Sequence, residues 1–320
     1  MRFVPLAFLA SLGLIGLSLM LPAAEQPGES SQRGKAEAAF KAGNFKDAYE
    51  AYRKLTLDPS ADRLKVSEDL NAGILCLAQL GRGDEIDEFR EAAIAAHKDN
   101  WRLLQKAAST YIDSDHQGFI VAGKFYRGGR RGGDGKYVNA LQRDRVRALQ
   151  LMEQGLPLAL KDDDRPAVSA FHLEFARILL GGNGNSDAWR LQVLTDISQL
   201  PDYEEGYFWR GGQSRGAPVD AGGKPVLHLV PSSYEAAQTD GERWRWMLSQ
   251  AIEVHPSRRN EVELIFADFL HGQFGVQTMA VGSWFRGASD DDDTKKDESG
   301  TYALHTLTDD ETIARLATGI

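Results

Sequence analysis

The feature that most constrains the fold is a spaced set of glycine, aromatic, small and proline residues near the front of the chain. The set consists of Gly43, Phe45, Ala48, Tyr52 and Pro59. Gly43 predicts the end of one helix, because glycine adopts the left-handed backbone conformation without a steric penalty. Ala48 lets a second helix approach the first, while Phe45 and Tyr52 fill the space between the two. Pro59 stops the second helix, so the set predicts a helical hairpin.

A second copy of the pattern follows 38 residues later. Gly81 takes the place of Gly43 and Ile86 takes the place of Ala48, while Leu77 lies on the apolar stripe of the preceding helix. The order and spacing of the two copies resemble tetratricopeptide repeats. That resemblance implies an α-solenoid of stacked helical hairpins, with a concave face for another polypeptide. An ordinary stack of helical hairpins shows the same periodicity and stays an alternative.

Helical patterning continues beyond the two copies, and we expect a mainly α fold. A third apolar stripe runs from Trp101 to Tyr111 without an obvious partner helix. Aromatic and β-branched residues at 207–209 and 226–230 predict a short β excursion near 205–231. The predicted segments are a leader at 1–24, a flexible spacer at 25–34, tetratricopeptide-like repeats at 35–126, a Gly/Arg loop at 127–136, a further helical region with the short β hairpin at 137–288, a charged linker at 289–300 and the start of a following segment at 301–320.

The leader predicts export. Arg2 supplies a positive charge, residues 3–21 form a nearly uninterrupted apolar run, and Ala23 and Ala24 supply small residues at a cleavage point. Pro22 is a poor match to the small residue preferred before cleavage. An uncleaved anchor formed by residues 3–21 therefore stays an alternative to a cleaved signal. Either form places the protein in the periplasm or the cell envelope.

Composition excludes several classes of function. The formal net charge is −9, and an acidic chain rarely presents the basic surface that nucleic acid requires. Hydrophobic residues make up 42% of the chain, which is ample for a buried core. The single cysteine, Cys76, excludes an internal disulfide and a thiolate cluster for zinc or iron–sulfur. We expect the partners to be other proteins or peptides, with a membrane contacted only through an uncleaved leader.

No catalytic, cofactor-binding or metal site is expected. Residues 212–216 match the G-x-S-x-G pattern of a hydrolase nucleophile elbow around Ser214, but the Gly- and Pro-rich residues 217–223 cannot begin the helix that such an elbow needs. The seven histidines include no pair at the i, i+4 spacing of a zinc-binding helix. No phosphate-binding glycine loop follows a predicted strand. A serine hydrolase using Ser214 stays the enzymatic alternative.

Three features together resemble the front end of bacterial alpha-macroglobulin-like proteins. They are the export leader, the tetratricopeptide-like helices, and the stretch from Tyr-Phe-Trp-Arg-Gly-Gly at 207–212 through Glu-Thr-Ile-Ala-Arg-Leu at 311–316. The resemblance implies large envelope proteins that trap or inhibit peptidases through a bait region and, in some members, a Cys-Gly-Glu-Gln thioester. Cys76 does not match that motif, so no functional residue is carried over.

We therefore expect a non-catalytic, exported protein–protein interaction module that is the leading part of a macroglobulin-like peptidase inhibitor. A capping pattern at Thr308 and Glu311 starts a helix whose apolar face continues to Ile320, so we expect the chain to be the front of a longer polypeptide. A self-standing repeat scaffold of the cell envelope is the second alternative.

Overall fold

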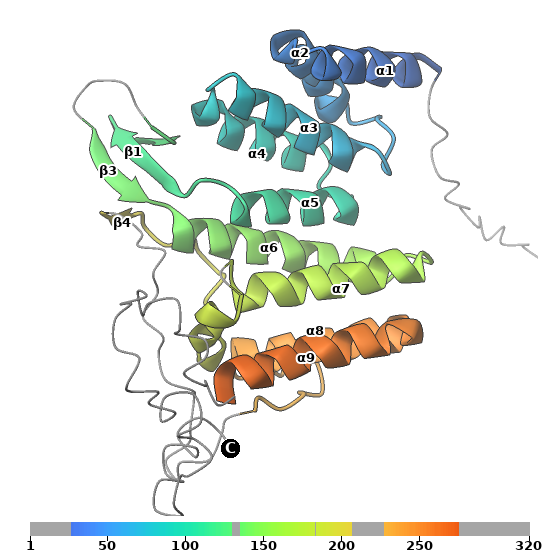
Figure 1. Ribbon diagram of the computed structural model, residues 1–320, viewed down its shortest axis with the longest axis vertical. Coiled ribbons are helices and arrows are strands. Elements are labelled where there is room, and N and C mark those ends of the chain that lie inside the picture. The colour runs from blue at the N-terminus through green and yellow to red at the C-terminus, as the bar shows by residue number, and fades with distance from the viewer. Residues whose placement is uncertain (1–26, 130–134, 183, 207–226, 275–320) are drawn as a thin grey trace, which may run out of the picture.

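The computed structural model describes residues 27–129, 135–182, 184–206 and 227–274. Within these residues the protein is mainly helical, with nine α-helices and one antiparallel sheet of four strands. The helices lie one above another in a tall stack, and the sheet lies beside the middle of that stack (Figure 1). The predicted mainly α fold is confirmed.

The first four helices of the described residues form two helical hairpins. They are formed by α1 (Pro27–Lys41), α2 (Phe45–Leu57), α3 (Val66–Gln79) and α4 (Ile86–Ala96). Both turns lie at the glycines that the sequence singles out, since Gly43 has a φ of +78° and Gly81 a φ of +67°. A Cβ atom at either position would meet nothing within 4 Å. The left-handed backbone, and not a lack of space, therefore requires glycine there.

The helix that carries the third apolar stripe packs against a helix that follows much later in the chain. Helix α5 (Trp101–Ile112) packs along α6 (Leu141–Ala159), and the residues between them form three strands. Leu103 and Leu104 on α5 are fully buried, as are Ala107 and Ala108. The third hairpin thus carries a β insertion in place of a tight turn. This insertion explains why the adjacent sequence offers α5 no partner helix.

Three further helices complete the stack. Helix α7 (Arg165–Leu180) packs against α8 (Asp240–Val254), and a short 3₁₀ turn leads from α8 to α9 (Arg259–Phe274). The side chain of Asp164 caps α7 by accepting a hydrogen bond from the N–H of Ala167. Between α7 and α8 a 3₁₀ helix covers Gly184–Gln192.

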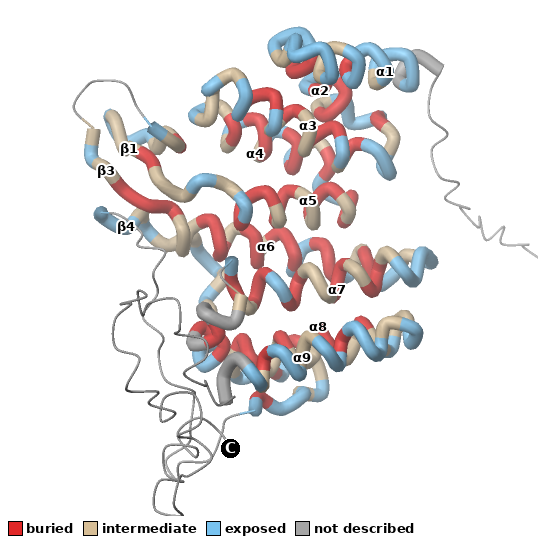
Figure 2. Tube along the Cα trace, in the orientation of Figure 1, coloured by how far each residue is buried: buried red, intermediate tan, exposed pale blue. Residues whose placement is uncertain are grey.

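One apolar core runs through the stack, and Figure 2 shows buried residues on every layer. Its largest fully buried side chains include Trp244, Phe171 and Phe175. The ring of Trp101 on α5 meets that of Phe171 on α7 edge to face, with centroids 5.6 Å apart. Each large side chain buried in this way stabilises the fold by about 1.5–3 kcal/mol relative to its exposed state.

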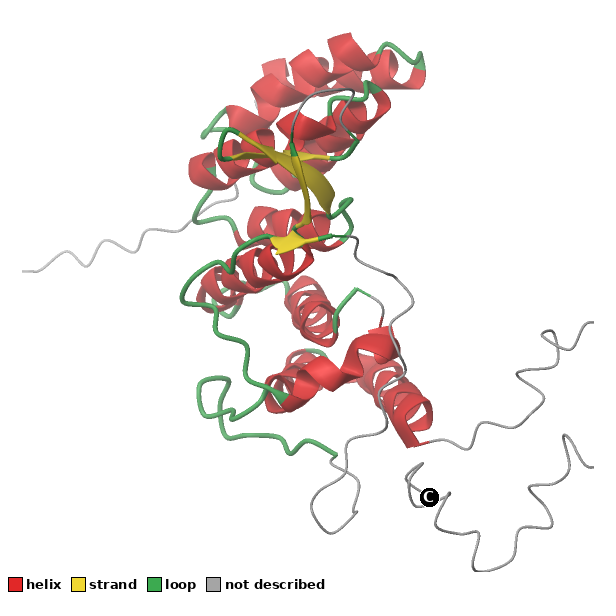
Figure 3. Cartoon of the chain, turned by 90° about the vertical axis from the view of Figure 1, so that its left-hand side faces the viewer, coloured by secondary structure: helices red, strands yellow, loops and turns green. Residues whose placement is uncertain are grey.

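The sheet has the strand order β2-β1-β3-β4, and all neighbouring strands are antiparallel. Its strands are β1 (Gln117–Val121), β2 (Lys124–Arg127), β3 (Lys136–Asn139) and β4 (Glu204–Glu205). Ala122 and Gly123 form the two-residue turn between β1 and β2, with φ values of +50° and +80°. Figure 3 shows the strands on one side of the helices.

The described residues show only the start of the β excursion predicted near 205–231. Only β4 forms there, and residues 227–230 carry no strand, while residues 207–226 lie outside the described ranges. Most of the sheet comes from 117–127, and all of that stretch except Arg127 lies in the segment at 35–126 that the sequence assigns to helical repeats. Apolar and aromatic residues on both sides of the Ala122–Gly123 turn favour a hairpin there. The Gly/Arg segment at 127–136 connects β2 to β3 and contributes its end residues to those strands.

The flexible spacer predicted at 25–34 is wrong from residue 27 onward. Helix α1 begins at Pro27, and proline suits the first turn of a helix because its missing N–H would have no partner there. The guanidinium Nε of Arg33 donates to Asp69 on α3 at 2.9 Å, and both side chains are largely buried. This ion pair ties α1 to α3.

The predicted leader, the charged linker at 289–300 and the segment at 301–320 all lie outside the described residues. Among the residues that are described, no helix combines the length and the apolar character that a bilayer crossing requires.

Candidate binding groove

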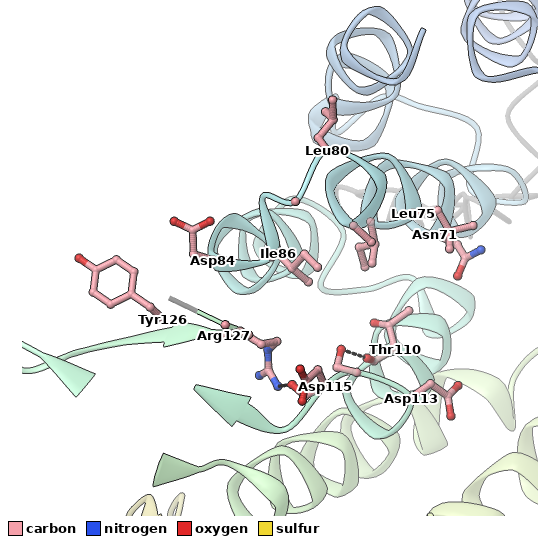
Figure 4. A pocket seen from close by; sticks show the side chains of 17 residues that line it. Asn71, Leu75, Leu80, Asp84, Ile86, Thr110, Asp113, Asp115, Tyr126 and Arg127 are labelled. Carbon is pink, nitrogen blue, oxygen red and sulfur yellow. Dashed lines mark hydrogen bonds between the residues drawn. The ribbon is translucent and has the colours of Figure 1, made fainter. Parts of the chain in front are cut away.

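A groove opens where the second helical hairpin faces the end of α5 and the sheet. Its volume is about 1120 Å³. In Figure 4, α3 and α4 form one wall, the end of α5 and the residues after it form the opposite wall, and the end of β2 lies at one side. Most pockets for small molecules occupy roughly 300–1,000 Å³. The size of this groove therefore suits a stretch of polypeptide.

The wall from the second hairpin is apolar. Ile74 and Leu75 come from α3, Leu80 comes from the turn, and Ile86 begins α4. Leu75 is 45% exposed, whereas Leu77 on the same helix is fully buried in the core. A helix in a stack usually presents polar side chains to solvent. Leu75 instead leaves an apolar surface that a bound partner would cover.

The opposite wall and the rim are acidic. Asp113 and Asp115 follow α5, and Asp84 lies in a short 3₁₀ helix (η1, Gly83–Glu85) that precedes α4. All three residues are exposed. Among the described residues Asp113 has one ion pair, a solvent-exposed contact of 3.3 Å with Arg177 that contributes little. The C-terminal end of α5 adds the negative end of its helix dipole. The groove therefore attracts positive charge.

Arg127 also lines the groove, but carboxylates below it neutralise its charge. Its Nη1 and Nη2 donate to the two oxygens of Asp144 at 2.7 and 2.9 Å, and its Nε donates to Asp87 at 3.1 Å. Nη1 also donates to the backbone carbonyl of Asp115 at 2.7 Å. Charge-assisted bonds of this kind hold a side chain firmly. Arg127 thus shapes the groove without offsetting the exposed carboxylates.

Asp144 is the centre of this buried network. It lies in the first turn of α6, and its Oδ2 also accepts from Nδ1 of His116, 2.7 Å away. Burial alone would raise the pKa of Asp144, but the hydrogen bonds from His116 and Arg127 hold that pKa below its ordinary value. Asp144 is therefore a buried carboxylate that fastens the sheet to α6.

Arg90 is fully buried next to the network formed by Arg127 and Asp144. Its Nη2 donates to Oγ of Ser114 at 2.9 Å, and its guanidinium lies 3.8 Å from the ring centroid of Tyr111. Nε and Nη1 of Arg90 have no hydrogen-bond partner among the described residues. Burial lowers the pKa of Arg90, while electrostatic interactions with Tyr111 and Asp87 act in the opposite direction. Because Ser114 lines the groove, Arg90 ties α4 to the opposite wall.

Two of the residues predicted to pack the repeats, Gly81 and Ile86, line the groove, and Leu77 lies buried in the core. The other five belong to α2 or flank it and are not part of the groove lining: Gly43, Phe45, Ala48, Tyr52 and Pro59. Ala48 and Tyr52 are buried, and the ring of Phe45 meets that of Phe40 on α1 with centroids 5.4 Å apart.

Sequence reasoning missed Leu75, Asp84 and Asp115. These residues form no motif, and Leu75 and Asp115 are 40 residues apart in the chain. They meet only because α5 packs against α3, which places the end of α5 beside the second hairpin. One signal was available, since Leu75 departs from the i, i+4, i+7 stripe of its helix and a leucine there faces solvent.

In the part of the chain that the structure describes, the chemical groups considered from sequence do not assemble a second site. Within the described residues, no cluster of three or more His, Cys, Asp or Glu side chains could hold a metal ion. Cys76 is buried, and burial raises the pKa of its thiol. Ser214 and the stretches at 207–212 and 311–316 lie outside the described residues.

Comparison of the chain with protein-family models, with curated proteins and with solved structures finds no match. The assignment of function therefore depends on the groove.

Proposed function

We propose that this chain is a non-catalytic, exported protein-interaction module in which tetratricopeptide-like helical hairpins form an α-solenoid and present the groove to another polypeptide. The observation that carries the proposal is the groove of about 1120 Å³ with an unpacked apolar wall at Leu75. Apolar surface left exposed in a concave site is typical of a binding surface.

The construction of the groove also supports this proposal. Its walls belong to packed helices, and the ion pairs of Arg127 with the buried Asp144 and the partly exposed Asp87 hold the sheet side in place. A rigid site loses little conformational entropy when a partner binds. The groove therefore suits a flexible partner segment, because on binding the segment becomes ordered while the groove itself changes little.

The module is proposed as the leading part of a macroglobulin-like peptidase inhibitor of the cell envelope. This part of the proposal rests on the resemblance of the leader, the helical pattern and residues 207–212 and 311–316 to that family. Continuation of the reading frame beyond Ile320 into macroglobulin β-domains is the expected result. A stop codon after Ile320 would instead favour a self-standing envelope scaffold.

Site-specific photo-cross-linking tests the binding role. A photoreactive phenylalanine analogue replaces Leu75 in the groove or, as the matched control, Leu64, which is 51% exposed and is not part of the groove lining. The full chain is expressed in a bacterium and irradiated in the isolated envelope. We expect a protein adduct at position 75 and none at position 64. Absence of any adduct at position 75 would contradict the proposal.

A further inference from the structure

We infer that the occupant of the groove is an extended polypeptide segment that alternates apolar residues with lysine or arginine. This inference rests on the proposed function and adds the chemistry of the partner. It follows from three properties of the groove, which are the position of its apolar wall, the position of its carboxylates and the pairing of Arg127.

The apolar side chains of α3 and α4 face a mainly polar wall across the groove, while Asn71 and Asp84 add polar groups on the α3–α4 side. Figure 4 shows Leu75 and Ile86 on one side, and Thr110, Asp113 and Asp115 on the other. Successive side chains of an extended strand point in opposite directions. An alternating segment would therefore direct one set of side chains to each wall, whereas a uniformly apolar or uniformly charged segment would satisfy only one.

The negative charge of the groove favours lysine or arginine at the polar positions of the bound segment. Asp84, Asp113 and Asp115 are exposed, and Arg127, the only arginine among the described lining residues, is paired with the buried Asp144 and the partly exposed Asp87. The C-terminal end of α5 adds further negative potential. An acidic segment would meet like charges at these positions, which disfavours binding. A lysine or arginine would gain ion pairs there.

Three fluorescein-labelled peptides of equal length probe this inference by fluorescence anisotropy with the full chain. The first alternates leucine with lysine, the second alternates leucine with glutamate, and the third alternates serine with lysine. We expect the leucine–lysine peptide to bind most tightly and its affinity to fall as salt is added. The glutamate and serine peptides are each expected to bind at least about tenfold more weakly.

Substitutions in the groove locate the binding. The variant Asp84→Asn/Asp115→Asn removes two exposed charges and is expected to weaken the leucine–lysine peptide about fivefold. A control with the same charge change, Asp163→Asn/Glu235→Gln, alters exposed carboxylates that do not line the groove and is expected to leave binding unchanged. Leu75→Ser changes no charge and is expected to weaken binding about tenfold.

Two results would overturn the inference. One is a leucine–glutamate peptide that binds as tightly as the leucine–lysine peptide. The other is an Asp84→Asn/Asp115→Asn variant that binds the leucine–lysine peptide as tightly as the Asp163→Asn/Glu235→Gln control does. If either occurs while position 75 still forms an adduct in the envelope, the groove binds a partner of different chemistry. If the adduct is also absent, the proposed function fails as well.

Discussion

Arg127 and Asp144 meet through two hydrogen bonds of 2.7 and 2.9 Å, and each side chain is only 4% exposed. Arg127 is the last residue of β2, and Asp144 lies in the first turn of α6. The pair therefore fixes the β insertion against the α5–α6 hairpin. Because the end of β2 lines the groove, the same ion pair also fixes the position of the sheet side of the groove.

Asp144→Asn is expected to destabilise the fold strongly. The substitution leaves the Arg127 cation buried without its main partner, which typically costs about 3–5 kcal/mol of the free energy of unfolding. Urea unfolding followed by circular dichroism measures the loss. Asp163→Asn in the exposed α6–α7 turn serves as the control, with an expected change within about 0.5 kcal/mol. Equal losses in the two variants would show that the buried pair does not hold the insertion.

Asp162 is expected to make stability depend on pH in the acid range. Its carboxylate accepts hydrogen bonds from Nε1 of Trp101 at 2.9 Å and from Nη1 of Arg102. Burial would raise the pKa of Asp162, but the hydrogen bonds from Arg102, the backbone of Asp164 and Trp101 lower it to about 2. The pKa of an aspartate in an unfolded chain is about 3.9.

Because the folded pKa is the lower of the two, ionised Asp162 stabilises the fold above about pH 4, and this contribution is lost as the pH falls to about 2. Asp162→Asn should therefore lower the thermal midpoint at neutral pH. The difference from the wild type should shrink through that window and vanish below it. Thermal unfolding of both proteins across the acid range provides the comparison, and a difference independent of pH would count against the hydrogen-bonded carboxylate.

Two glycine substitutions are expected to have opposite effects. Gly43→Ala places a side chain on a residue with a φ of +78° and should lower the free energy of unfolding by about 1–2 kcal/mol. Gly34→Ala lies in α1, where a Cβ would meet nothing within 4 Å, and should raise it by about 0.5–1 kcal/mol. Denaturant unfolding of both variants measures these changes. Stabilisation by Gly43→Ala would exclude a constrained turn at that glycine.

A fluorophosphonate probe tests the proposal that the chain is not an enzyme. Such probes label serines that an adjacent base activates. We expect no labelling of the full chain, because the residues after Ser214 cannot begin the helix of a nucleophile elbow. A known serine hydrolase in the same reaction serves as the positive control. Labelling that disappears in Ser214→Ala would establish the hydrolase alternative.

Local sequence signals predicted the parts of the fold that local chemistry determines. Gly43 and Gly81 mark turns because left-handed backbone favours glycine, and both turns were predicted from these residues alone. The partner of α5 was not predictable in this way, since α6 follows only after the β insertion. The β1–β2 hairpin has a local signal at Ala122–Gly123, which the neighbouring glycine-rich segment obscured.

The groove was less predictable than the helices. Leu75 and Asp115 come from different elements, and their proximity depends on the packing of α5 against α3 and on the position of the sheet. The Arg127–Asp144 pair that steadies the groove is likewise formed between a strand and a helix. Charge and hydropathy along the chain give no signal for contacts of this kind, because they arise from tertiary packing.

The most direct test of the binding role is the yield of the photo-cross-linked adduct at position 75 relative to position 64, measured in one envelope preparation with and without the unlabelled leucine–lysine peptide. We predict a polypeptide adduct at position 75 that the peptide suppresses, and no adduct at position 64. Equal yields at the two positions, or no adduct at position 75, would contradict the assignment of the groove as a binding site.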